Sequence, residues 1–415
     1  MKSFNLLIIL LVLAVQAYSQ QLAFPGAVGC GKYASGGRGG DVYHVTNLNN
    51  EGQGSFRDAV SQPGRTVVFD LGGVIKINSK VQVASNITIA GQTAPGEGIV
   101  IYGDGVTFSG SKNVIVRYLR LRGSINMSRG SCTLIADHAE DMIFDHVSVQ
   151  WGRWDNLHIK KSNNITLQNC IIGESIDPQR FGALLETPTN ISVFNCLWID
   201  NQSRNPKAKA KIEFVNNVIY NWGVSGFVGG HSSAHHYQDI INNYFIAGPN
   251  SKDAFVDFFS ETDHVFHKGN LADLNKDGLL NGRQVLDEDF ISKKATLEKK
   301  TVLFNEDKQS VLSAQDSYEY VLKNAGCSHR RDAVDKRLIG YLKSLGTEGV
   351  IFKNEQDAGG QGEIRSGKHP KDSDNDGIPD KWERRNKLNP KNPHDQAEVS
   401  TSGYSRLEEY LNSII

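Results

Sequence analysis

Short β-type runs that recur at a nearly constant spacing constrain the fold of this chain more than any other feature. These runs are rich in β-branched residues, which is typical of strands. They begin about 21 to 28 residues apart, one solenoid coil each, at residues 86–89, 113–116, 141–144, 164–167, 190–193, 211–214 and 239–242. Helical repeats need a period of about 3.6 residues, which is absent. We therefore predict an all-β fold, a right-handed parallel β-helix in which equivalent positions stack.

Two kinds of side chain are expected to stack from coil to coil. Four asparagines follow their strands at similar offsets and predict a ladder that satisfies backbone groups at the turns; they are Asn169, Asn195, Asn217 and Asn243. The five cysteines are an odd number in an exported chain, which argues against a disulfide framework. Cys170 and Cys196 hold equivalent places in successive strands, so we expect them to stack in the core.

Residues 1–19 predict a secretory signal peptide. Lys2 gives a positive start, residues 6–15 form an apolar core, and Ala17 and Ser19 are small residues that suit cleavage. This core is shorter than the roughly 20 residues of a membrane span, and no later segment is apolar enough. We expect a secreted or periplasmic protein. The net charge of −1 gives no indication of nucleic-acid binding.

The rest of the chain divides into three expected parts. Residues 20–290 carry the repeats and predict the β-helix domain. Residues 291–358 are expected to form a partly helical extension packed on the β-helix, with helices near 310–322 and 330–339. Residues 359–415 begin with a glycine-rich linker and continue as a separate cassette.

The cassette contains an acidic loop with the spacing of an EF-hand. Acids stand at loop positions 1, 3, 5, 9 and 12, and glycine stands at position 6, as in EF-hand calcium loops. The acids are Asp372, Asp374, Asp376, Asp380 and Glu383. This pattern predicts a structural calcium ion; the alternative is an acidic turn that binds nothing.

A basic segment between two predicted strands is the candidate functional site. Residues 201–209 contain Arg204, Lys207 and Lys209, and no acid occurs before Glu213. Cations fixed at the edge of a sheet suit an acidic substrate. Taken alone, the same segment would also fit a solvated basic turn.

Several segments in the expected order make this chain resemble the pectate lyases of polysaccharide lyase family 1, and more closely the bacterial branch of that family. The segments are residues 91–98, 116–122, 144–148, 203–206 and 216–222. The resemblance covers roughly residues 22–285. It implies a parallel β-helix and β-elimination of polygalacturonate to unsaturated oligogalacturonides.

β-Elimination beside a uronate carboxylate needs a cation to neutralise that carboxylate, a base for the C5 proton and a proton for the departing oxygen. By resemblance Arg204 is the base, a role that arginine can fill only where other cations favour its neutral form. Lys209 matches an arginine that grips the substrate. The other substrate-binding residues that we expect are Lys207, Arg180, Arg153 and Trp151.

The calcium site implied by the resemblance is incomplete in this sequence. Cys132 and Trp154 fall where acids are expected, which leaves Asp155 and Glu174 as candidate ligands. Calcium needs six to eight oxygen ligands, so two acids are few, although substrate carboxylates would add oxygens.

Three functions therefore stay open. The first is a pectate lyase, and the second is a calcium-independent pectin lyase on methylated pectin, in which Arg153 and Arg180 replace the metal. The third is a pectin-binding β-helix protein without catalysis. In each case we expect a monomer that binds an acidic plant polysaccharide.

Overall fold

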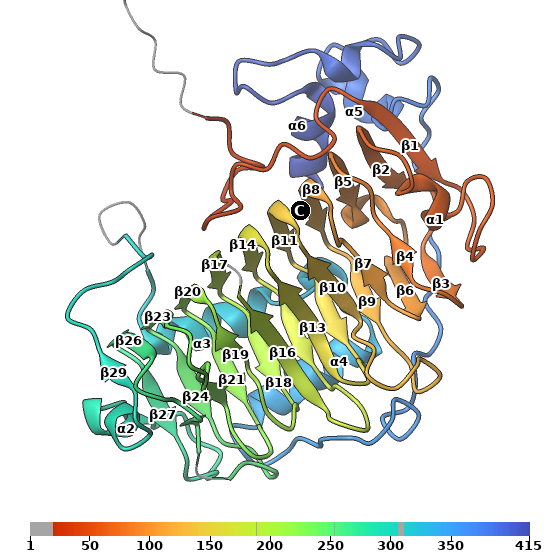
Figure 1. Ribbon diagram of the computed structural model, residues 1–415. Coiled ribbons are helices and arrows are strands. Elements are labelled where there is room, and N and C mark those ends of the chain that lie inside the picture. Colours follow the sequence, from red (N-terminus) through yellow and green to blue (C-terminus); the bar gives the residue numbers. More distant parts are fainter. Residues whose placement is uncertain (1–19, 188, 253, 306–310) are drawn as a thin grey trace, which may run out of the picture.

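The predicted parallel β-helix is confirmed. The computed structural model describes residues 20–187, 189–252, 254–305 and 311–415. Successive coils contribute strands to three sheets, which we call A, B and C (Figure 1). The predicted signal peptide, residues 1–19, lies outside the described residues. Within the described ranges, no helix combines the length and the apolar character that crossing a membrane requires.

Sheet A has eleven strands, and neighbouring strands are parallel. They are β1 (Asp41–Val45), β2 (Arg65–Phe69), β5 (Ile87–Ala90), β8 (Lys112–Arg117), β11 (Glu140–Asp145), β14 (Asn163–Gln168), β17 (Thr189–Phe194), β20 (Lys211–Val215), β23 (His236–Ile241), β26 (Asp263–Lys268) and β29 (Thr296–Leu297). An N-terminal segment covers part of its outer face, where Ala23, Phe24, Ala27 and Ala34 pack against Ile115 and Ile143.

Sheet B has ten strands, of which only the last pair is antiparallel among the described residues. They are β3 (Gly73–Ile77), β6 (Ile99–Gly103), β9 (Arg120–Arg122), β12 (Ser148–Gln150), β15 (Ile171–Gly173), β18 (Leu197–Ile199), β21 (Val218–Tyr220), β24 (Tyr244–Ile246), β27 (Leu271–Asp273) and β28 (Arg283–Gln284).

Sheet C has eight strands and carries the candidate site. They are β4 (Val81–Gln82), β7 (Val106–Thr107), β10 (Leu134–Asp137), β13 (Asp155–Lys160), β16 (Phe181–Glu186), β19 (Lys207–Lys209), β22 (Phe227–Val228) and β25 (Val256–Asp257). Buried apolar side chains from all three sheets fill the inside of the coils and form one continuous core.

The helices lie outside the coils. Two short ones, α1 (Phe56–Ala59) and α2 (Asp287–Ile291), lie near the ends of the β-helix, and α5 (Asp380–Arg385) and α6 (Arg406–Ser413) belong to the cassette (Figure 1). The two helices expected in the extension are α3 (Ala314–Asn324) and α4 (Ala333–Lys343). They cover the outer face of sheet B, where Tyr318, Val321, Leu338, Ile339 and Leu342 pack against residues of β15, β18, β21 and β24.

Buried ion pairs fix α4 on sheet B. Arg122 is fully buried on β9, and its guanidinium donates to Asp332, the N-cap of α4, at 2.6 Å and to Asp335 at 3.1 Å. These two carboxylates raise the pKa of Arg122, although burial alone would lower it. Because a buried charge is costly without its partner, α4 is held in one position on the sheet.

The predicted asparagine ladder exists, but the four asparagines predicted to form it belong to two different stacks. Asn195, Asn216 and Asn242 have positive φ angles and turn the chain, as Asn169 does. The buried ladder is one residue further on, where the side-chain oxygen of Asn243 accepts from the backbone of Asn217 at 2.8 Å. In the two preceding coils the equivalent position is held by Cys170 and Cys196, which are free and buried as expected.

We expect Asn243→Ala to lower the free energy of unfolding by roughly 2 to 4 kcal/mol, because it leaves buried donors of Asn217 and the Phe214 carbonyl without partners. Asn49→Ala, in an exposed loop, is the matched control and should change it by less than about 0.5 kcal/mol. Denaturant unfolding measures both. Equal effects would contradict a stabilising ladder.

Candidate active site

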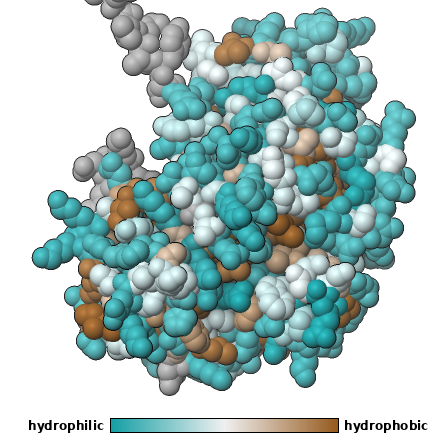
Figure 2. Space-filling view, viewed as in Figure 1, coloured by the Kyte–Doolittle hydropathy of each residue, from teal (hydrophilic) through white to brown (hydrophobic). Residues whose placement is uncertain are grey.

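The outer face of sheet C carries two rows of partly exposed side chains set by the strand register. In the first row Ile135 aligns with His158, then with Leu184, then with Lys207. Two residues along, the second row consists of Asp137, Lys160, Glu186 and Lys209. Residues two apart on a strand share a face, so the rows form one strip, in which Ile135 and Leu184 are apolar and the other residues are polar or charged. The face of the molecule shown in Figure 2 is predominantly hydrophilic.

Arg204 lies at one edge of this strip, just before β19. Its backbone is held against β16, because the Ala183 amide donates to the Arg204 carbonyl at 2.8 Å and Ser203 bridges to Phe181. The Arg204 side chain is 19% exposed, so its guanidinium is reachable from solvent. The basic segment is therefore a built part of sheet C and not a loose turn.

Two neighbours fix the Arg204 guanidinium. Its Nη1 donates to both carboxylate oxygens of Asp155, at 3.1 and 3.2 Å. Its Cζ lies 4.0 Å from the centroid of the Phe181 ring, which is a cation–π contact. Asp155 is fully buried, and burial raises its pKa to about 6 although Arg204 pulls in the opposite direction. Sequence reasoning missed Phe181, whose only signal was its place at the start of a strand.

Lys207 and Lys209 are the other cations of the strip. They stand two residues apart on β19, so both point to the outer face. Burial lowers the pKa of Lys207, and the charges of Lys209 and Arg204 lower it further. Three cations on one segment thus repel one another, and a negatively charged ligand would relieve this repulsion.

Arg153 and Arg180 meet around Asp177, on the loops that precede β13 and β16. Arg153 donates to the Asp177 carbonyl at 3.1 Å, and Arg180 lies 3.2 Å from the Asp177 carboxylate. The Gln202 amide donates to the Arg180 carbonyl, which joins this pair to the segment that carries Arg204. The structure therefore brings both arginines to the same end of the strip.

The structure contradicts Glu174 as a partner of Asp155 in a calcium site. The Glu174 carboxylate is buried, forms an ion pair with Arg337 of α4 and accepts from Trp151 Nε1 at 3.2 Å. Its charge and its oxygens are thus engaged at the interface with the extension. The sequence could not show this, because Arg337 lies far along the chain.

The residues around Arg204 do not fit a calcium ion held by protein ligands. Asp155 is already paired with Arg204, and Cys132 beside it is a poor ligand, because burial and the Asp155 charge raise the pKa of its thiol to about 12. Across the ranges that the structure describes, groups of three or more acidic, histidine or cysteine side chains with ligand atoms within 4.8 Å of one another occur only in the cassette.

Trp151 needs correction as a substrate-binding residue. It is 0% exposed and packs with Ile176 and Val334, so it cannot stack on a sugar. Trp154 is 36% exposed, and its carbonyl accepts from the Phe181 amide. Of the two tryptophans, Trp154 is the one that a polysaccharide could reach.

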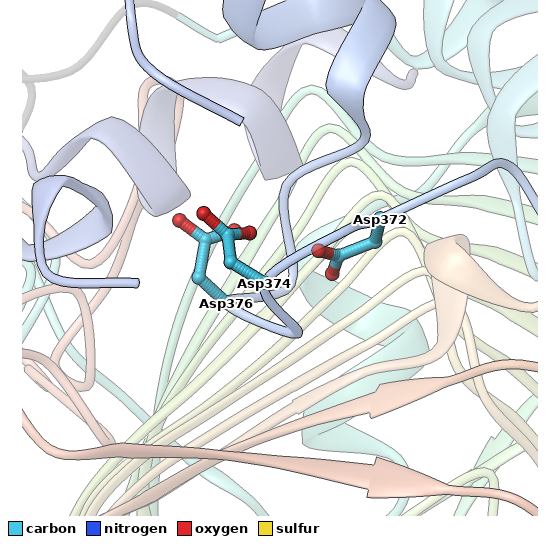
Figure 3. Close-up of side chains that lie close together, drawn as sticks. All are labelled: Asp372, Asp374 and Asp376. Carbon is cyan, nitrogen blue, oxygen red and sulfur yellow. The ribbon is translucent and has the colours of Figure 1, made fainter. Parts of the chain in front are cut away.

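The acidic loop of the cassette is only partly arranged as the EF-hand spacing predicts. Asp372, Asp374 and Asp376 lie together, with their carboxylates facing a common space (Figure 3). Glu383 joins Asp376 in a second group, whose third member is Asp395. Asp380, expected as a ligand, is outside both groups. Sequence reasoning missed Asp395 because it lies beyond the loop.

Comparison with known proteins agrees with this architecture. The chain is 43% identical over 406 residues, 96% of its length, to the probable pectate lyase C of Aspergillus flavus, and covers 95% of that protein. It is 42% identical to the probable pectate lyase C of Aspergillus fumigatus, with 100% of this chain and 99% of that protein covered. A solved pectate lyase bound to a hexasaccharide has the same fold, with a TM-score of 0.54 and 12% identity, covering 75% of this chain and 99% of that one. No family model matches the chain.

A β-helix that carries Arg204, Lys207 and Lys209 at one sheet, together with relatives of this identity and coverage, defines a polysaccharide lyase scaffold. The chain belongs to the pectate lyase family. The relatives named here are fungal, whereas the motifs had suggested the bacterial branch.

We expect the stability of wild-type protein relative to Asp155→Asn to fall as the pH rises from about 4 to about 7. The folded protein binds a proton at Asp155 more tightly than the unfolded chain does, because the folded pKa is raised to about 6. Ionisation then costs the folded state on the order of 3 kcal/mol. Melting temperatures across this range measure the effect, and the exposed Asp41→Asn is the control. A difference that is constant with pH would contradict a buried, titrating Asp155.

We expect Arg337→Ala to destabilise the protein by roughly 3 kcal/mol, because it leaves the Glu174 charge buried without its cation. Adding Glu174→Gln should recover part of the loss, since it removes that charge. Denaturant unfolding of the two single variants and the double variant measures the coupling. Additive losses would contradict the pairing.

Proposed function

We propose that this protein is a pectate lyase that cleaves polygalacturonate by β-elimination, with Arg204 as the general base. The observation that carries the proposal is the position of Arg204, which is fixed by Asp155 and Phe181 and has Lys207 and Lys209 on the adjoining strand. Relatives named pectate lyase over the whole length of the chain support it.

The basic side chains have different roles in the reaction. Lys207 and Lys209 neutralise the carboxylate of the bound uronate, which makes its C5 proton more acidic. Arg204 takes that proton, the C5–H electrons form the C4–C5 double bond, and the C4–O bond breaks. The departing oxygen takes a proton from water. Asp155 is a positioning residue: it holds one edge of the guanidinium and leaves the other nitrogens for the substrate.

A calcium-independent pectin lyase is the second candidate, and one observation favours it. The buried carboxylate of Asp155 is paired with Arg204, and Arg153 and Arg180 add positive charge. The exposed ring of Trp154 would suit a less charged, methylated chain.

We further infer that the protein is exported and acts as a monomer on an acidic plant polysaccharide. The N-terminal sequence supports export, and the polar strip supports a linear anionic ligand. A structural calcium ion is expected in the cassette and not beside Arg204.

We expect Arg204→Ala to reduce release of unsaturated uronides from polygalacturonate by roughly 10²- to 10⁴-fold, because the base is lost. Arg283→Ala is the matched control, since Arg283 is an exposed arginine on sheet B paired with Asp289. Ultraviolet absorbance of the product measures both. Equal rates for wild type and Arg204→Ala would contradict Arg204 as the base.

The same assay separates the candidate functions. Activity on polygalacturonate that persists in excess chelator supports neutralisation by Lys207 and Lys209, and circular dichroism checks that the fold is intact. A preference for highly methylated pectin would favour the pectin lyase. Binding without any product would favour the non-catalytic protein.

A further inference from the structure

We infer that the cassette binds one divalent cation, best matched by calcium, in a site that Asp395 completes and that does not use Asp380. The site therefore differs from a twelve-residue EF-hand loop, in which the ninth position supplies a ligand. It lies apart from Arg204, Lys207 and Lys209 and is independent of the lyase chemistry.

Ligand atoms from three segments converge. Asp372, Asp374 and Asp376 each offer a carboxylate oxygen, and these oxygens lie within 4.8 Å of one another. Figure 3 shows Asp374 and Asp376 side by side with the Asp372 carboxylate facing them. Asp376 also belongs to a second group within the same limit, with Glu383 of α5 and Asp395. Asp376 is common to both groups, which links the five carboxylates into one cluster.

The carboxylates are buried without the partners that a stable protein needs. Glu383 is 0% exposed, and neither of its oxygens has a hydrogen-bond partner among the described residues. Both oxygens of Asp374, Oδ2 of Asp376 and Oδ1 of Asp395 also lack a hydrogen-bond partner there, whereas the two oxygens of Asp372 accept from the backbone amides of Asn375 at 2.8 Å and Gly377 at 2.9 Å. Burying an unpaired charge is costly, so a cation is the simplest group that satisfies them.

The charges around the site also favour a bound cation. No basic side chain of the described ranges forms an ion pair with Asp374, Asp376, Glu383 or Asp395. These acids therefore repel one another in the absence of a counter-charge.

Asp380 is already satisfied elsewhere. Its carboxylate accepts from the Ser373 amide at 2.8 Å, from Lys371 Nζ at 3.1 Å and from Arg384 at 2.9 Å. Two cations thus neutralise it, and its oxygens are engaged. Asp395 replaces it: one Asp395 oxygen accepts from the Asn389 amide at 3.0 Å, and the other is left for the site.

The donor set fits calcium better than other common cations. All candidate ligands are carboxylate oxygens, which hard cations prefer, and no thiol or imidazole belongs to the two groups. Five carboxylates in an irregular arrangement suit the flexible coordination of calcium. Magnesium demands a near-octahedral shell and usually keeps several waters.

A cation here would tie the cassette together against the first coils. It would join the loop before α5, α5 itself and the short 3₁₀ helix η4 (Asp395–Ala397). Ile378, Leu407 and Leu411 of the cassette pack against Ala90 of β5, and Figure 1 shows the cassette beside β1, β2 and β5. The site therefore stabilises a cap on the N-terminal end of the β-helix.

Calcium titration calorimetry of the full-length, chelator-treated protein tests the inference. We expect Glu383→Gln and Asp395→Asn to weaken one calcium-binding event at least tenfold. Asp380→Asn is the matched control, and it should change that affinity less than about threefold. Loss of binding in Asp380→Asn with wild-type affinity in Asp395→Asn would overturn the ligand set in favour of an EF-hand. No binding event that depends on Glu383 would overturn the site.

A second set of measurements distinguishes a loss of calcium binding from misfolding of the variants. Circular dichroism should show the β-helix intact in all three variants, since each neutral replacement also reduces repulsion or keeps a hydrogen bond. In wild type, calcium should raise the melting temperature and protect the cassette from limited proteolysis, and Asp395→Asn should lose both effects. Equal protection of wild type and Asp395→Asn by calcium would contradict the inference.

Discussion

The parallel register between successive coils is the constraint on which the rest of this structure depends. Each strand pairs with the strand one coil away, so residues distant in sequence are fixed side by side. Asp155, Phe181 and Ser203 meet in this way, and Arg204 follows directly. A shift of one residue in any of these strands would reverse its faces and separate the guanidinium from its carboxylate.

The covering of the sheets determines where a substrate can bind. An N-terminal segment and the cassette pack on sheet A, and α3 and α4 pack on sheet B. Sheet C keeps its strip of partly exposed polar residues. Arg122 contributes indirectly, because its ion pairs hold α4 on sheet B and away from the strip. The extension thus stabilises the scaffold without blocking the site.

Local patterns in the sequence were sufficient for the fold and for the basic segment. Strand periodicity predicted the coils, and Arg204 directly precedes β19, an inner strand of sheet C. Long-range partners were beyond such patterns. Glu174 forms an ion pair with Arg337, and Trp151 is buried against the same extension, so neither side chain is available to a ligand beside Arg204. Asp395 replaces Asp380 because nearby cations already neutralise Asp380, which motif spacing does not reveal.

The central claim is that the cations beside Arg204 on sheet C receive the uronate whose C5 proton is removed. A crystal structure of the Arg204→Ala variant with trigalacturonate tests it most directly. The account predicts a uronate carboxylate within ion-pair distance of Lys207 and Lys209, with its C5 facing the vacated arginine position. A saccharide bound on another face, or one held in the strip with its carboxylates away from both lysines, would contradict it.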